Sequence, residues 1–180
     1  MRKRTANAFK EGQKTWGSYD EFPLAAEGID PGPHLSRSRV AQPFHLVTAV
    51  DELLVTMAGT GRVEFRTPHG IKSIDFEPGS VIYLPARMPA RVLPDSEALQ
   101  IRMKTAAPYQ EAVAFFCGSC DALVHSVEFV TDVPQRKYWD TVVAFNDSPA
   151  QRTCGTCGRT AEPVDLTEFA WNDVADALTS

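Results

Sequence analysis

The chain has 180 residues, of which 43% are hydrophobic and 23% charged, and its formal net charge is −5. This composition is typical of a soluble globular protein with one domain of ordinary size. The acidic balance argues against broad binding to nucleic-acid phosphates. No apolar run reaches the roughly 18 residues of a membrane-spanning helix, and the N-terminus lacks the apolar core of a secretory leader. We therefore expect a cytoplasmic protein with no nucleic-acid or membrane partner.

Residues 1–37 are rich in glycine, proline and charge, with turn signals such as Gly12, Gly17 and Pro23. The apolar residues of this segment, for example Trp16, follow no period. We predict an irregular N-terminal arm over 1–37 that wraps the domain or a partner subunit.

Short segments of strand character follow one another between turn residues from Ser38 onward. Five or six strands at close, even spacing without intervening helices are typical of a β-sandwich or barrel. The sequence therefore predicts an all-β domain over 38–110. Its expected strands cover residues 44–50, 53–57, 62–66, 71–76, 80–84 and 98–104.

A C-terminal extension is predicted over 111–180. We expect a short linking helix or an irregular crossover at 105–116, and a strand at 123–130. Apolar residues at helical spacing predict a terminal helix over 165–178, capped by Asp165 and with an acidic outer face. This helix is expected to pack on the domain, with a role in partner binding as the alternative.

Two pairs of cysteines are the most specific signal in the chain, and 33 residues separate them. Each pair encloses two residues, so a tight turn can direct both thiolates at one ion. Four thiolates suit a structural zinc, or iron in a rubredoxin-like site, and leave no open coordination position. Two disulfides are the alternative, which the absence of a secretory signal disfavours. The predicted ligands are Cys117, Cys120, Cys154 and Cys157.

The turns of the barrel segment carry a two-part motif. The first part contains His45, Glu52 and Gly59, and the second runs from Gly79 through Pro85. This spacing resembles the two halves of a cupin barrel, where histidines and a glutamate converge on a metal. Valine and alanine hold two of the expected histidine positions, at Val47 and Ala90, and Arg87 holds an expected glycine position.

Residues 44–159 resemble bacterial 3-hydroxyanthranilate 3,4-dioxygenase, a small cupin followed by an extension with two cysteine pairs. The likeness includes Phe115-Phe116 before the first pair, Leu123-Val124-His125 after it, and Gly158 after the second pair. The resemblance implies a cupin jelly roll, a homodimer, and a catalytic iron held by two histidines and a glutamate. The positions that match these ligands are Leu46 (or His45 after a one-residue shift), Glu52 and Ala90.

The residues at these positions predict a remodelled pocket. We expect Glu52 and His45 to act as catalytic polar or acid–base groups, and a small aromatic or related carboxylic acid to be the ligand. Its carboxylate is expected to bind Arg102, Arg91 or Arg39, without ring opening by the iron mechanism. In the alternative interpretation, Glu52 pairs with Arg102 and His45 is a hydrogen-bonded core or rim residue. Two further alternatives are an iron-dependent dioxygenase and a non-catalytic binding or scaffold cupin.

Overall fold

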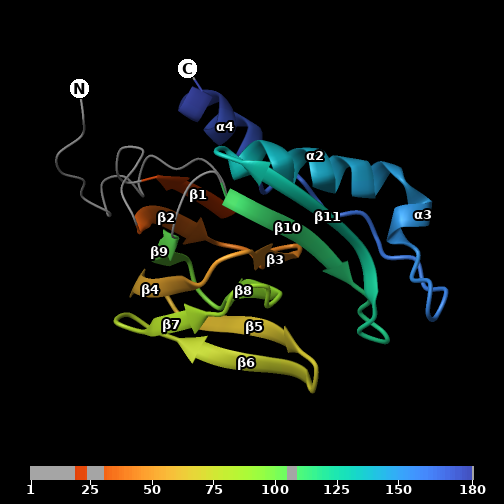
Figure 1. Ribbon diagram of the computed structural model, residues 1–180, viewed down its shortest axis with the longest axis horizontal. Coiled ribbons are helices and arrows are strands. Elements are labelled where there is room, and N and C mark those ends of the chain that lie inside the picture. The colour runs from red at the N-terminus through yellow and green to blue at the C-terminus, as the bar shows by residue number, and fades with distance from the viewer. Residues whose placement is uncertain (1–18, 24–30, 105–108, 180) are drawn as a thin grey trace.

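The computed structural model (Figure 1) describes residues 19–23, 31–104 and 109–179 as two antiparallel sheets with helices at one end. The five-stranded sheet has the order β1-β2-β9-β4-β7. Its strands are β1 (Tyr19–Pro23), β2 (Gly32–Ser38), β9 (Ala98–Lys104), β4 (Glu52–Ala58) and β7 (Val81–Leu84). The six-stranded sheet has the order β11-β10-β3-β8-β5-β6. Its strands are β11 (Leu123–Thr131), β10 (Tyr109–Phe116), β3 (His45–Thr48), β8 (Ala90–Pro94), β5 (Gly61–Thr67) and β6 (Gly70–Phe76).

Strands β2 to β9 form the barrel, four in each sheet, in the orders β2-β9-β4-β7 and β3-β8-β5-β6. This is the strand order of a jelly roll, which is the double-stranded β-helix of cupins. The prediction of an all-β cupin is therefore confirmed. Gly59, between β4 and β5, shows why one motif glycine is needed: its φ is 83°, and a Cβ there would lie 2.3 Å from the carbonyl oxygen of Glu97.

The barrel core consists of apolar side chains that alternate along the strands of both sheets. Val63 and Phe65 of β5 pack there with Leu54 of β4 and Ile82 of β7. Because successive side chains of a strand face opposite sides, this core fixes which face of every strand is the inner one.

The C-terminal extension adds β10 and β11 to the edge of the six-stranded sheet and covers their inner face with helices. These helices are α2 (Pro134–Asp147), α3 (Pro149–Arg152) and α4 (Trp171–Thr179). Tyr138 and Trp171 are fully buried in a second core that also contains Phe44 and Leu46 from the barrel side. Strand β10 spans the boundary predicted between 110 and 111 and pairs with β3.

Four local predictions differ from the structure. Strands β1 and β2 lie in the segment expected to be irregular, because β2 pairs with β9 and β1 pairs with β2, which extends the sheet there. Residues 109–116 form β10 rather than a helix or crossover, since they pair on both sides. Helix α2 was not predicted. The terminal helix begins at Trp171, because Asp165 accepts hydrogen bonds from Thr167 in a local turn instead of capping a helix.

Within the described ranges, none of the helices combines the length and the apolar character needed to cross a membrane.

Candidate functional site

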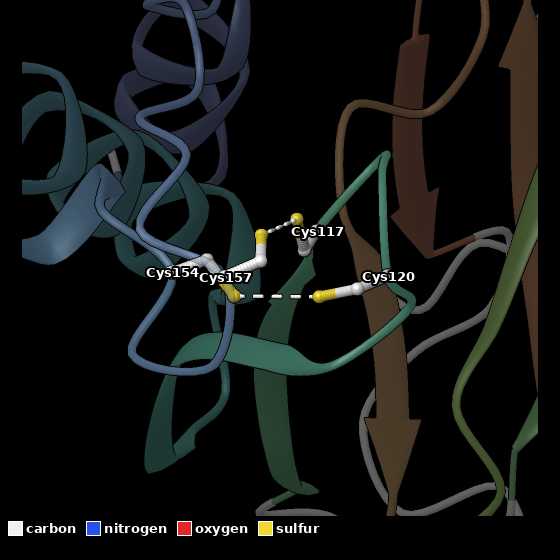
Figure 2. A group of neighbouring side chains, drawn as sticks. All are labelled: Cys117, Cys120, Cys154 and Cys157. Carbon is white, nitrogen blue, oxygen red and sulfur yellow. Dashed lines mark hydrogen bonds between the residues drawn. The ribbon is translucent and has the colours of Figure 1, made fainter.

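The four cysteines come together from two turns of the same design (Figure 2). In the first turn, the amide of Asp121 donates to the carbonyl of Cys117, and the Cys117 amide donates to Ala122. In the second, the amide of Gly158 donates to the carbonyl of Cys154, and the Cys154 amide donates to the carbonyl of residue 159. The turns therefore require a positive φ at the same position, which is 58° at Asp121 and 73° at Gly158.

The sulfur geometry suits a single tetrahedral ion. The Sγ atoms of Cys117 and Cys157 are 3.6 Å apart, as are those of Cys120 and Cys154, and all four lie within 4.8 Å of one another. Zinc–sulfur bonds of about 2.3 Å in a tetrahedron place sulfurs about 3.8 Å apart. Backbone amides of Cys157 and Thr156 lower the pKa of Cys154 to about 6, which favours the thiolate that binds metal. The four cysteines are thus positioned to bind a metal.

A network of buried charges occupies the barrel and reaches α2. Arg102 of β9 donates from Nη1 to Oε2 of Glu52 on β4, over 2.9 Å. Lys104 Nζ donates to Oε1 of Glu111 at 2.6 Å and lies 3.9 Å from Oε1 of Glu52. The Tyr138 hydroxyl donates to Glu111 Oε2 at 2.6 Å. Among the described residues of this network, two carboxylates therefore face two cations, and buried charges need such pairing.

The side chains of Glu52 and His45, the predicted catalytic pair, do not meet: Glu52 points into the barrel and His45 points away from it. Glu52 shares the inner face of β4 with Leu54 of the barrel core, and its side chain is 1% exposed. On β3, Leu46 is paired with Ala90, which packs against the same core. His45 is the neighbour of Leu46 and therefore points outward. Leu46 and Ala90, at the two histidine positions, offer no metal-binding atom beside Glu52.

His45 belongs to an ionic cluster on the outer face of the six-stranded sheet. Its Nε2 lies 3.1 Å from Oε1 of Glu64, which also accepts from Nε of Arg91 at 3.0 Å. Burial, together with the cations of Arg91 and Arg66, lowers the pKa of His45 to about 4. Burial acts to raise the pKa of Glu64, but the pairs with Arg91 and His45 hold it below its usual value. Neutral His45 is therefore held as a structural residue between the Glu64 carboxylate and Arg66, whose Nε donates to His45 Nε2 over 3.3 Å.

The three arginines predicted to hold a carboxylate lie in three separate places. Arg102 pairs with Glu52 inside the barrel, and Arg91 pairs with Glu64 outside it. Arg39 is half exposed and lies 3.0 Å from Oε2 of Glu97. The structure therefore gives each arginine a carboxylate of its own and does not assemble them into one pocket.

Sequence reasoning did not identify Lys104, Glu111 or Tyr138 as members of the barrel network. Glu111 fell in a segment expected to be a linker, and Tyr138 in one without an assigned element. The spacing of Tyr138, Val142 and Phe145 is that of a helix with one buried face, which was the available signal. His125 stacks on Phe145 beside the cysteine segment.

Two open hollows lie next to the turn that joins β7 to β8. The larger, of about 460 Å³, reaches from this turn to the β5–β6 hairpin and to Asp121 of the cysteine segment. The smaller, of about 230 Å³, reaches from the same turn to Glu111 and to Glu128 of β11. Arg87 lines both hollows.

Comparison with known proteins gives a partial match in sequence. No family model matches the chain. The 3-hydroxyanthranilate 3,4-dioxygenase of Shewanella woodyi is 32% identical over 83 residues, which cover 44% of this chain and 44% of that enzyme. The match therefore spans less than half the length of this relative.

Comparison with solved structures returns proteins of low sequence identity. A hydroquinone 1,2-dioxygenase of Sphingomonas sp. TTNP3 is 14% identical, with a TM-score of 0.48 over 56% of this chain and 73% of that one. A cupin-2 domain protein of Shewanella frigidimarina is 16% identical, with the same score over 56% and 94%. The fold assignment rests on the strand order given above.

Proposed function

We propose that this protein is a cupin related to the 3-hydroxyanthranilate dioxygenases that binds a small aromatic or related carboxylic acid without iron-dependent ring opening. The sequence match to the Shewanella woodyi enzyme supports the relationship. The barrel supports the loss of iron chemistry, because a non-haem iron site needs three ligands, and the two positions that match histidine ligands are Leu46 and Ala90, which pair with each other on β3 and β8. Any reaction of the bound acid is then a metal-independent step, such as a proton transfer.

The observation that carries the proposal is the ion pair between Glu52 and Arg102. A glutamate that coordinates iron has its carboxylate free to reach the metal. The Glu52 carboxylate instead accepts a 2.9 Å hydrogen bond from the buried guanidinium of Arg102. Lys104 adds a second cation at 3.9 Å. Two cationic side chains therefore already lie against the glutamate, and a divalent cation beside it would be repelled by both of them.

We also propose that the cysteine centre is a structural zinc or iron site. Its ligand shell would be complete with four thiolates, so it has no open position for substrate. The visible spectrum separates the two metals, because ferric thiolate centres absorb visible light and zinc centres are colourless. From the family resemblance we propose a homodimer, which size-exclusion chromatography with light scattering tests directly.

Metal content is the first test of the iron-free barrel. We expect one metal ion per chain, lost in Cys117→Ser and retained in Glu52→Gln. The matched control is Glu77→Gln, which removes the charge of an exposed glutamate in a turn. Two ions per chain, with one lost only in Glu52→Gln, would overturn the proposal and favour an iron-dependent dioxygenase.

Ligand binding is the second test. A panel of hydroxylated and aminated benzoates is added to the full chain, with calorimetry for binding and an electrode for oxygen uptake. We expect binding with no oxygen consumption. Oxygen uptake with ring-opened product supports the dioxygenase alternative, and absence of binding to every acid supports a scaffold role.

A further inference from the structure

The larger hollow has the size and lining of a small-molecule site. Its volume of about 460 Å³ lies in the range of about 300–1,000 Å³ that is usual for such sites. Arg66 and Arg87 bring two positive charges to it, and Asp121 brings one negative charge. Apolar side chains make up most of the remaining wall: Pro68, Ile71, Ala86, Met88, Pro89 and Phe116.

Arg87 adopts a backbone conformation that an arginine rarely adopts. Its φ is 62°, at the third position of a turn closed by the hydrogen bond from the Met88 amide to the Pro85 carbonyl. This position favours glycine, because a Cβ is strained at positive φ. The amide of Arg87 donates to the Thr48 carbonyl at 2.7 Å, which holds the residue in place. Backbone strain of this kind is characteristic of functional sites.

The Arg87 side chain is exposed and makes no hydrogen bond or ion pair with the described part of the chain. No side-chain contact among the described residues therefore accounts for an arginine where glycine would be less strained. The side chain keeps its charge available at the rim of the hollow.

Arg66 is the second cation, and its orientation is fixed. Its guanidinium lies 4.6 Å above the ring of Phe116, and Nη1 donates to Asp121 Oδ1 at 2.9 Å. Its side chain is 12% exposed. Because Asp121 is engaged by Arg66, the charge that remains in the hollow is positive, although the whole chain carries −5. An anion with one negative charge and an apolar body complements this lining.

We infer that this outer hollow, rather than the barrel interior, is the binding site for a small aromatic monocarboxylate. The carboxylate binds Arg87 with support from Arg66, and the ring packs on Met88, Ile71 and the prolines. This inference rests on the proposed function and gives it a location, on the opposite side of the sheet from Glu52 and Arg102.

The variant Arg87→Gly gives the sharpest test, because it should make the fold more stable and the binding of ligand weaker. Glycine relieves the strain at φ 62°, so we expect the melting temperature to rise by about 2–4 °C. Loss of the guanidinium removes a charge-assisted contact, so benzoate should bind at least about tenfold more weakly. Arg62→Gly is the matched control, since Arg62 is half exposed on the same sheet outside this lining and faces Asp95 at 3.9 Å.

Methionine methyl groups report where the ligand lies in the intact protein. Of the four methionines, Met88 lines the hollow, whereas Met57 and Met103 lie on β4 and β9 of the other sheet. With ¹³C-methyl methionine, titration with benzoate or 2-aminobenzoate should shift the Met88 resonance saturably and leave those of Met57 and Met103 unchanged. Ile71→Glu, a change of a 42% exposed side chain, should abolish the shift by placing a carboxylate in the wall.

The outcomes separate this inference from the proposed function. If the wild type binds benzoate but Met88 does not shift and Arg87→Gly binds normally, the outer site is wrong and the proposed function stands. If the wild type binds no acid, both are wrong. If benzamide or inorganic phosphate binds the hollow as well as benzoate does, the assignment of an aromatic carboxylate is overturned.

Discussion

Breaking the pair between Glu52 and Arg102 should destabilise the protein far more than breaking an exposed pair. In Arg102→Met, the Glu52 carboxylate stays buried at 1% exposure, with the Lys104 ammonium at 3.9 Å as its remaining described cation. That ammonium already donates to Glu111 at 2.6 Å, so among the described groups of this network two carboxylates would share one cation. Removing one partner of a buried pair costs about 3–5 kcal/mol. In a chain of this size, that lowers the melting temperature by about 6–20 °C.

The double variant Glu52→Gln/Arg102→Met restores charge balance and should recover most of the loss. Replacing both members of a buried ion pair by uncharged side chains is often close to neutral, so we expect it within about 2 kcal/mol of the wild type. Urea unfolding followed by circular dichroism, at equal metal content, measures all three variants. Arg39→Met removes one partner of the half-exposed pair with Glu97 and should cost less than about 1 kcal/mol. If the double variant loses as much free energy of unfolding as the two single variants together, charge balance does not govern the stability of this core.

Three further predictions follow from the site. Cys117→Ser should release the metal and lower the melting temperature, and metal analysis with calorimetry would contradict this if the metal stayed. Tyr138→Phe removes the 2.6 Å hydrogen bond to buried Glu111 and should cost about 1.5–3 kcal/mol in urea unfolding, with an unchanged slope; a loss below about 0.5 kcal/mol would refute the role of that hydrogen bond. His45 has a pKa of about 4 when folded and an ordinary value of 6.5, so between these pH values the unfolded chain binds more protons. Stability should therefore rise by about 3 kcal/mol from pH 4 to 6.5, at about 1.4 kcal/mol per pKa unit, and His45→Gln should remove that part of the pH dependence.

The barrel was predictable from sequence because its strands are short, amphipathic and separated by turn residues. The alternation at 62–66 and 71–76 became the β5–β6 hairpin, and the glycine motif fell at Gly59 as expected. The cysteine centre was equally accessible, since the spacing within each pair is a local property of a turn. In both cases the pattern that carries the prediction is local: a strand with its turn, or a single pair of cysteines.

The inner and outer faces of β3 were not predictable in the same way. Pairing between β3 and β8 decides whether His45 or Leu46 faces the barrel, and a shift of one residue reverses the answer. The partners of Glu52 likewise come from β9, about 50 residues away. Arg87 was noted as a substitution at a glycine position, but only the fold shows that its side chain borders a hollow.

The sharing of one core between the barrel and the helices has a consequence for the order in which the protein is made. All eight barrel strands lie within residues 32–104, so the jelly roll can pair before the second cysteine pair has been synthesised. Phe44 and Leu46 lie in a core that is complete only once β10, α2 and Trp171 have been made. A ribosome paused after β11 would therefore hold a nearly complete barrel with an apolar open end. The four-cysteine centre also forms late, because Cys157 is made after all the strands of both sheets.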